Sequence, residues 1–222
     1  YFITHDIYEE WALEKLISSA YKTKESNNHF FGEIGASLPV RRSLRNWLSE
    51  QLLLEHHEIK GFVEEIIDSS EVETYWKDEI LVSVLLSSYS EIFFDIFQES
   101  LIVNECKLLK KLSFILRIAC KEIDDTFLKQ LGIKNLKLFS SKYTPTKPKG
   151  LGWESLIKFT YENIKVIGAS NLDFIFPVIN DWNTKSKVGE TTKYSSLIAL
   201  EYYQSTINKH HHRVSTSVLQ TI

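Results

Sequence analysis

The chain has 222 residues, of which 43% are hydrophobic and 13% aromatic, enough apolar material to bury one sizeable core or two small ones. This composition excludes disorder of the whole chain. Lys and Arg number 26 against 29 Asp and Glu, and the net charge of -3 provides no general attraction to nucleic acid or to an anionic membrane. We therefore expect neither a nucleic-acid partner nor a membrane partner.

The two cysteines, Cys106 and Cys120, form no CxxC pair and lie near no histidine cluster with zinc-finger spacing. The sequence therefore indicates neither a disulfide framework nor a structural zinc site. We expect two free, buried thiols and a reducing, cytoplasmic location. No apolar run is long enough to cross a bilayer.

Helix-breaking residues are few, with 8 Gly and 4 Pro, and apolar residues recur at spacings of three and four, which predicts an all-α protein. The first expected helix buries a stripe of Leu13, Leu16, Ile17 and Ala20. After a segment rich in Asn and Gly, a second helix is expected from about Pro39, a residue favoured in the first turn of a helix.

Residues 57–120 repeat the apolar pattern in short units. Ser70 and Glu73 have the spacing of a capping box that opens one of these helices. Because consecutive helices joined by short links usually lie antiparallel, we expect helical hairpins here.

Residues 124–150 end in a basic stretch that contains Pro and Gly, and they are predicted to form a linker or extended loop. Three helices are expected after it, over about residues 153–167, 172–182 and 191–207. Ser170 and Asp173 have a second capping-box spacing, and Gly168 and Gly189 lie where helices should end.

The expected organisation is therefore a helical region over residues 1–123, the linker over 124–150 and a helical-repeat segment over 151–222. Helix pairs of this length favour antiparallel pairs stacked in an array like that of an α-solenoid. No strict repeat period is visible, so any repeats are divergent or few.

Two histidine runs are candidate metal ligands. His210, His211 and His212 are adjacent, and adjacent side chains on a helix point in different directions, so they cannot close on one ion. His56 and His57 fail for the same reason. We expect no metal site, and a solvated helix end for the longer run.

Arg41, Arg42 and Arg45 form a small basic group, and Arg42 and Arg45 at a spacing of three can share a helix face. The group could contact a phosphate or an acidic neighbour. The alternative is a solvated or salt-bridged face. The lysines of residues 142–149 also have two interpretations, which are contact with nucleic acid and a flexible loop.

No catalytic constellation is recognisable. The sequence has no GxSxG elbow, no HExxH motif and no Gly-rich phosphate loop, and its paired carboxylates are adjacent residues that diverge on a helix. We therefore expect that this chain is not an enzyme and holds no cofactor.

The opening segment FITHDIYEEWALEKL resembles the end of the winged-helix region of STAND-class NTPases, including the NACHT group. There a strand delivers F-x-H-D before a helix of the form x-x-x-E-[YW]-x-x-A-x-x-L. The corresponding residues here are Phe2, His5, Asp6, Glu10, Trp11, Ala12 and Leu16. The resemblance implies that His5 approaches the phosphates of bound ADP in a full-length parent protein. The alternative is that His5 and Asp6 cap the helix that follows.

A second segment, residues 149–203, is similar to a helical segment that follows the NTPase core in large bacterial STAND ATPases. The matching residues are Gly150, Trp153, Ile157, Phe159, Pro177, Val178, Asp181, Trp182, Asn183, Gly189, Glu190, Thr191, Ala199, Leu200 and Tyr202. These residues also have a purely structural interpretation, with Trp153 and Trp182 as packing anchors and Pro177 at a helix start or bend.

The resemblance implies an excised, non-catalytic helical scaffold or sensor from a large STAND-type NTPase. Its implied partners are an N-terminal NTPase domain of the same protein, which would hold ATP or ADP with Mg²⁺, and a protein trigger, in a parent that can act in antiviral defence. One alternative is a freestanding α-solenoid adaptor that binds peptides or proteins. Another is a helical nucleic-acid module that uses the arginine group and the lysines of residues 142–149.

Overall fold

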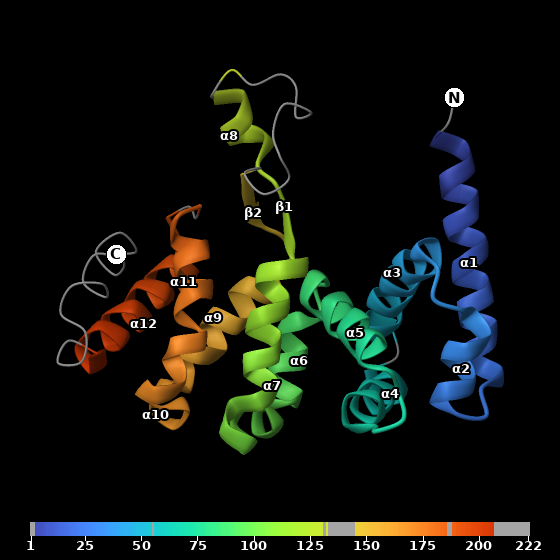
Figure 1. Ribbon diagram of the computed structural model, residues 1–222, viewed down its shortest axis with the longest axis horizontal. Helices are drawn as coiled ribbons and strands as arrows, with labels where there is room; N and C mark the ends of the chain where they lie inside the picture. Colours follow the sequence, from blue (N-terminus) through green and yellow to red (C-terminus); the bar gives the residue numbers. More distant parts are fainter. Residues whose placement is uncertain (1–2, 55, 131, 133–144, 186–187, 207–222) are drawn as a thin grey trace. The chain divides into compact units, whose positions relative to one another are not determined.

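The computed structural model describes residues 3–54, 56–130, 132, 145–185 and 188–206, with the backbone alone for residues 3–7, 56–58 and 60. The predicted all-α array is confirmed. The described part contains twelve α-helices, one 3₁₀ helix and two short strands (Figure 1). The chain divides into two compact units, residues 1–89 and 90–222, which we call the N-terminal and C-terminal units.

The N-terminal unit consists of helices joined by short turns. Its helices are α1 (Ile3–Thr23), α2 (Asn27–Ile34), α3 (Leu38–Leu54), α4 (His56–Asp68) and α5 (Thr74–Leu86). Helix α3 packs against both α1 and α5 and so forms the middle of the unit. Most of α5 is buried, including Trp76, Ile80 and Val84, so this helix lies in the core of the unit.

Aromatic side chains fill the space among α1, α2, α3 and α4. The Tyr21 ring lies 5.0 Å from the Phe62 ring and 5.1 Å from the Trp47 ring, measured between centroids. Phe30 meets Phe62 edge to face at 5.6 Å. Edge-to-face pairs add to the stabilisation that comes from burial alone. These contacts join four helices that are separated along the sequence.

The capping box predicted for Ser70 and Glu73 is wrong. Helix α5 begins at Thr74, and Glu73 occupies the N-cap position without a side-chain hydrogen bond. The Ser69 hydroxyl instead accepts hydrogen bonds from the backbone N–H groups of Glu71 and Val72, at 3.1 and 3.2 Å. Ser69 therefore folds the turn between α4 and α5, one residue earlier than the motif suggested.

The start of the chain also differs from the expectation. Helix α1 begins at Ile3, so His5 and Asp6 lie inside the helix rather than before it. The predicted strand before this helix is therefore absent from residue 3 onward, and neither residue is the N-cap. Residues 1–2, which include Phe2 of the motif, lie outside the described residues.

The C-terminal unit combines helices with a two-stranded antiparallel ribbon. Its elements are α6 (Ser90–Ile96), α7 (Gln98–Ala119), β1 (Lys121–Ile123), α8 (Asp125–Gln130), β2 (Thr146–Pro148), α9 (Gly152–Glu162), α10 (Ile164–Ile167), the 3₁₀ helix η3 (Ala169–Phe174), α11 (Phe176–Asn183) and α12 (Glu190–Thr206). Strand β1 pairs with β2 in the register Glu122 opposite Lys147, next to the end of α7 (Figure 1).

Helix α7 contains a left-handed turn. Asn104, Glu105 and Cys106 have φ angles of 51°, 55° and 58°, a region that is unfavourable for residues with a side chain. The turn separates a short first part of α7 from the regular helix that starts near Lys107. Both cysteines are buried and neither forms a disulfide bond, as predicted.

The indole of Trp153 fixes the junction of α7, the ribbon and α9. Its ring is fully buried, and its Nε1–H donates to the backbone carbonyl of Cys120 at 2.8 Å. The same carbonyl accepts the backbone N–H of Lys149 at 3.0 Å. A buried tryptophan normally pairs its N–H, and here the acceptor is the carbonyl of the residue that caps the end of α7.

The helices of the C-terminal unit lie close to the predicted ones, with two corrections. The helix expected over residues 153–167 is divided at Asn163 into α9 and α10. The capping box at Ser170 and Asp173 is wrong, because both residues lie within η3 and α11 starts at Phe176. Gly168 ends α10 with a φ of 75°, and Pro177 lies in the first turn of α11, as predicted. Of the predicted linker, residues 124–130 and 145–150 include α8 and β2, and residues 131 and 133–144 lie outside the described part.

Candidate interaction surface

The outward side of α1 carries large apolar side chains that are largely exposed. Tyr8 is 70% exposed, Trp11 60% and Leu16 47%. With the exposed residues Ala12 and Lys15 they follow the spacings of three and four that define one helix face. We call Tyr8, Trp11, Ala12, Lys15 and Leu16 the α1 outer face.

The opposite side of α1 faces the core of the N-terminal unit. Ile17 and Ala20 are buried there, and Tyr21 joins the aromatic cluster. Leu16 was predicted to share this buried stripe, and that assignment is wrong, because Leu16 lies on the outer face. Helix α1 therefore has two apolar sides. One of them is buried in the core of the N-terminal unit, and the other is exposed.

The α1 outer face holds three residues of the first STAND-like motif. Trp11, Ala12 and Leu16 are all exposed, whereas Glu10 is half-buried. The Lys15 ammonium lies 5.7 Å from the centroid of the Trp11 ring, a cation-π contact at the surface. The apolar residues of this motif are therefore not explained by packing within the described part of the chain.

The second STAND-like motif behaves in the opposite way. Trp153, Ile157 and Val178 are fully buried. Asp181 accepts hydrogen bonds from Arg117 and Lys121, and Asn183, Glu190 and Tyr202 also make contacts within the C-terminal unit. Packing and internal hydrogen bonds account for most of these residues, although Leu200 is 42% exposed, and this agrees with their structural interpretation.

The arginine group on α3 is divided by the fold. Arg41 Nε lies 2.7 Å from Glu79 Oε1, and Arg45 Nε lies 2.6 Å from Glu79 Oε2. The Glu79 side chain is only 3% exposed, so both arginines compensate a buried carboxylate on α5. Arg42 is exposed. The arginines that share a helix face are therefore Arg41 and Arg45, at a spacing of four. Their ion pairs with Glu79 agree with the alternative of a salt-bridged face.

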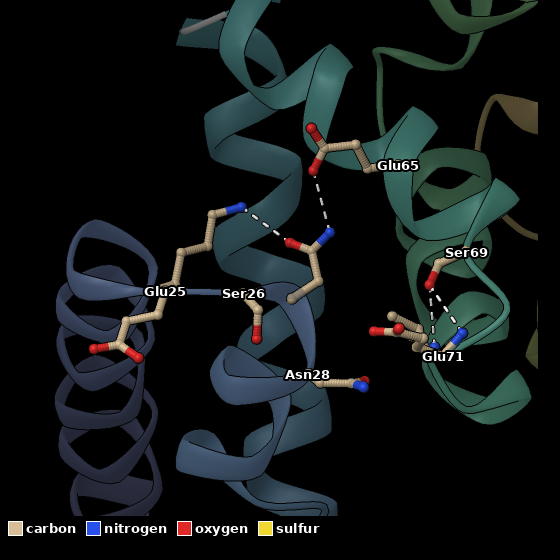
Figure 2. Close-up of a pocket in the computed structure, with 9 residues that line it drawn as sticks. Glu25, Ser26, Asn28, Glu65, Ser69 and Glu71 are labelled. Carbon is tan, nitrogen blue, oxygen red and sulfur yellow. Dashed lines mark hydrogen bonds between the residues drawn. The ribbon is translucent and has the colours of Figure 1, made fainter.

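A polar pocket of about 460 Å³ lies where the α1–α2 turn meets the end of α4 (Figure 2). Lys24 Nζ donates to Asn27 Oδ1 at 3.1 Å, and Asn27 Nδ2 donates to Glu65 Oε2 at 3.2 Å. Burial lowers the pKa of Lys24, and the Glu65 carboxylate opposes this shift. Figure 2 shows Glu25 and Ser69 on opposite sides of the pocket. These contacts connect the α1–α2 turn to the last part of α4, so the side chains have a structural role.

The histidines give no site in the described part of the chain. His5 lies in α1 and His56 and His57 in α4, but their side chains are outside the described residues, as is the run His210–His212. Within the described residues, no three side chains of His, Cys, Asp or Glu are grouped to hold a metal ion. Across the same residues, no helix combines the length and apolarity required to cross a membrane.

Sequence reasoning did not predict the α1 outer face, although a signal was present. Tyr8, Trp11, Lys15 and Leu16 already have helical spacing, but the stripe of Leu13, Ile17 and Ala20 overlaps them along the sequence. Apolar residues on both sides of one helix can indicate either a fully buried helix or a helix with an external partner. The exposure of Tyr8, Trp11 and Leu16 in the structure excludes a fully buried helix.

Comparison with known proteins adds no assignment: no protein-family model matches the chain, and no curated protein sequence matches it.

Proposed function

We propose that the chain is the non-catalytic helical sensor part of a STAND-type NTPase. In this role it passes the binding of a protein trigger to a nucleotide-binding domain of the same protein, in the cytoplasm. The observation that carries the proposal is the α1 outer face, where Trp11, Ala12 and Leu16 of the STAND-like motif are exposed.

Exposed apolar groups of this size favour a docking role. Trp and Tyr supply much of the binding energy in protein interfaces, because their large apolar surface is desolvated on contact. In helical arrays, each helix pair buries its faces against its neighbours, and an end that has no partner normally presents a polar side. The α1 outer face has the composition of a contact surface instead. Its proposed occupant is the nucleotide-binding domain.

No nucleotide chemistry is assigned to this chain. The sequence contains no GxxxxGK[ST] loop, so its residues do not fit a triphosphate site. The resemblance connects His5 alone with a phosphate, and only within a full-length parent. The part proposed for this chain is mechanical, and it requires that the two states of the parent differ in their contacts with α1.

The proposal is tested by binding between this chain and the P-loop domain that the same gene is expected to encode. The measurement is isothermal titration calorimetry with the double variant Trp11→Ala/Leu16→Ala. Loss of two central apolar contacts should weaken binding by at least about tenfold. Leu38→Ala, which also removes an exposed apolar side chain, is the matched control and should leave the affinity unchanged.

Two results would contradict the proposal. One is a gene that encodes no P-loop domain, which would favour the freestanding adaptor. The other is equal binding by the wild type and the double variant, which would place the contact elsewhere on the chain.

A further inference from the structure

The regular part of α7 is basic and apolar. Residues 107–121 read KLLKKLSFILRIACK and contain five basic residues but no Asp or Glu. This composition is independent of the α1 outer face, because α7 belongs to the C-terminal unit.

The helix separates these residues into two sides. Leu109, Leu112 and Leu116 are fully buried. Phe114 and Ile118 point outward, and each is 64% exposed. Lys107, Lys111, Phe114 and Ile118 follow one another at spacings of four, three and four, the repeat of a single helix face. We call these four residues the α7 outer face.

Further cations border this face on the side of η3 and α11. Arg117 Nε and Lys121 Nζ lie 2.9 and 2.8 Å from Asp181 Oδ2, so one carboxylate serves two cations. Lys110 Nζ lies 5.3 Å from the centroid of the Phe174 ring. The flank therefore retains a positive charge after its internal contacts are counted.

We propose that the α7 outer face docks an acidic amphipathic protein segment, in the form of a helix. Phe114 and Ile118 would contact the apolar stripe of that helix, and its flanking carboxylates would lie near Lys107, Lys111 and the border formed by Lys110 and Arg117. This arrangement places an apolar centre inside a charged rim, the usual organisation of a protein interface. The complementary charges would also increase the association rate.

The same chemistry disfavours the other anionic macromolecules. Single-stranded nucleic acid binds through stacking on several aromatic rings, and this face has one ring, Phe114, beside an aliphatic side chain. An anionic bilayer needs a longer apolar face than the pair Phe114 and Ile118. An acidic amphipathic helix presents carboxylates next to apolar side chains. These groups complement the lysines and the apolar side chains of the α7 outer face.

The experiment uses the full chain and a fluorescent synthetic helical peptide with Leu and Phe on one face, flanked by Glu. A matched peptide carries Lys in place of each Glu. Fluorescence anisotropy should show binding of the acidic peptide only, and the affinity should fall as salt is raised. Phe114→Ala/Ile118→Ala and Lys107→Glu/Lys111→Glu should each weaken it by at least about tenfold. Leu200→Ala and Lys193→Glu, exposed positions on α12, are the controls.

The changed side chains are exposed except for the half-buried Lys111, so the variants should fold, and circular dichroism checks this point. The proposal is overturned if the acidic peptide does not bind, if the Lys peptide binds equally well, or if the α12 controls weaken binding as much as the α7 variants. It is also overturned if single-stranded DNA or anionic phosphatidylserine vesicles bind through Phe114 while the acidic peptide does not.

Discussion

Arg45 and Glu79 are joined across the N-terminal unit, with Arg45 Nε donating to Glu79 Oε2 at 2.6 Å. Arg41 binds the other oxygen of the same carboxylate. These residues are 34 and 38 positions from Glu79 in the sequence, and they connect α3 to α5. A buried carboxylate is tolerated here because two guanidinium groups compensate its charge.

Removal of both arginines should therefore be costly. The variant Arg41→Ala/Arg45→Ala leaves Glu79 buried without its cations, and we expect a loss of about 3–5 kcal/mol in the free energy of unfolding. Glu79→Gln should cost less, because the arginines are about one-third exposed and can reach water. Urea denaturation gives the values. Arg42→Ala is the control and should change the free energy by no more than about 0.5 kcal/mol. An equal effect of Arg42→Ala would contradict the assignment.

Substitutions of Trp153 should destabilise the C-terminal unit by an amount that depends on whether only the hydrogen bond or also the ring is removed. Trp153→Phe keeps most of the ring but removes the donor to the Cys120 carbonyl, and it should lower the free energy of unfolding by about 1–2 kcal/mol. Trp153→Ala should cost about 3–5 kcal/mol, because it also leaves a cavity. Trp182→Phe, at a half-buried site with a longer 3.3 Å bond to Thr192, is the control and should cost less than Trp153→Phe. Circular dichroism follows the unfolding, and the reverse order of the two Phe variants would contradict this prediction.

Asp124 should make the stability depend on acid pH. The backbone N–H of Phe127 donates to this carboxylate at 3.0 Å and, together with Lys185, lowers the pKa of Asp124 below its ordinary value of 3.8. A lowered pKa in the folded state means that the stabilisation is complete above 3.8 and is lost as the pH falls through the folded-state pKa.

The measurement is an NMR titration of the Asp124 carboxyl carbon, together with thermal unfolding below pH 5. Asp124→Ala should unfold at a lower temperature at neutral pH and should show a weaker loss in acid. Asp125→Asn, a change at the exposed neighbouring residue, should keep the acid dependence. A titration of Asp124 at or above 3.8 would contradict this prediction.

The two sides of α1 should respond differently to truncation. Ile17→Ala removes a fully buried side chain and should cost about 2–5 kcal/mol in the free energy of unfolding. Trp11→Ala removes a larger side chain from the surface and should cost at most about 1 kcal/mol, including the contact with Lys15. Chemical denaturation of the two variants measures the difference. A loss for Trp11→Ala equal to that for Ile17→Ala would show that the fold itself needs Trp11.

Local patterns explain which parts of the fold the sequence could predict. Helices such as α3, α9 and α12 follow from apolar spacing and from breakers such as Gly168, because these are properties of neighbouring residues. The left-handed turn at Asn104–Cys106 has no Gly or Pro to mark it, so no local sequence signal indicated it. The two capping boxes had the right spacing, but tertiary packing placed the helix starts elsewhere.

Surface features were harder to predict because they depend on distant residues. The identity of the anion near the arginines, Glu79, is set by the packing of α3 on α5. The α7 outer face required knowledge of which side of a basic, apolar helix meets the core. For the α1 outer face, the motif was visible in the sequence, but its exposure was not.

Iodide quenching of Trp11 tests most directly whether the α1 outer face docks a nucleotide-binding domain. Of the five tryptophans, Trp47, Trp76 and Trp153 are buried and Trp182 is half-buried, so iodide reports mainly on Trp11, and Trp11→Phe isolates its share of the signal. The proposed role predicts strong quenching of the Trp11 fluorescence in this chain and protection from iodide in the full-length gene product. Equal quenching of Trp11 in both proteins would contradict it.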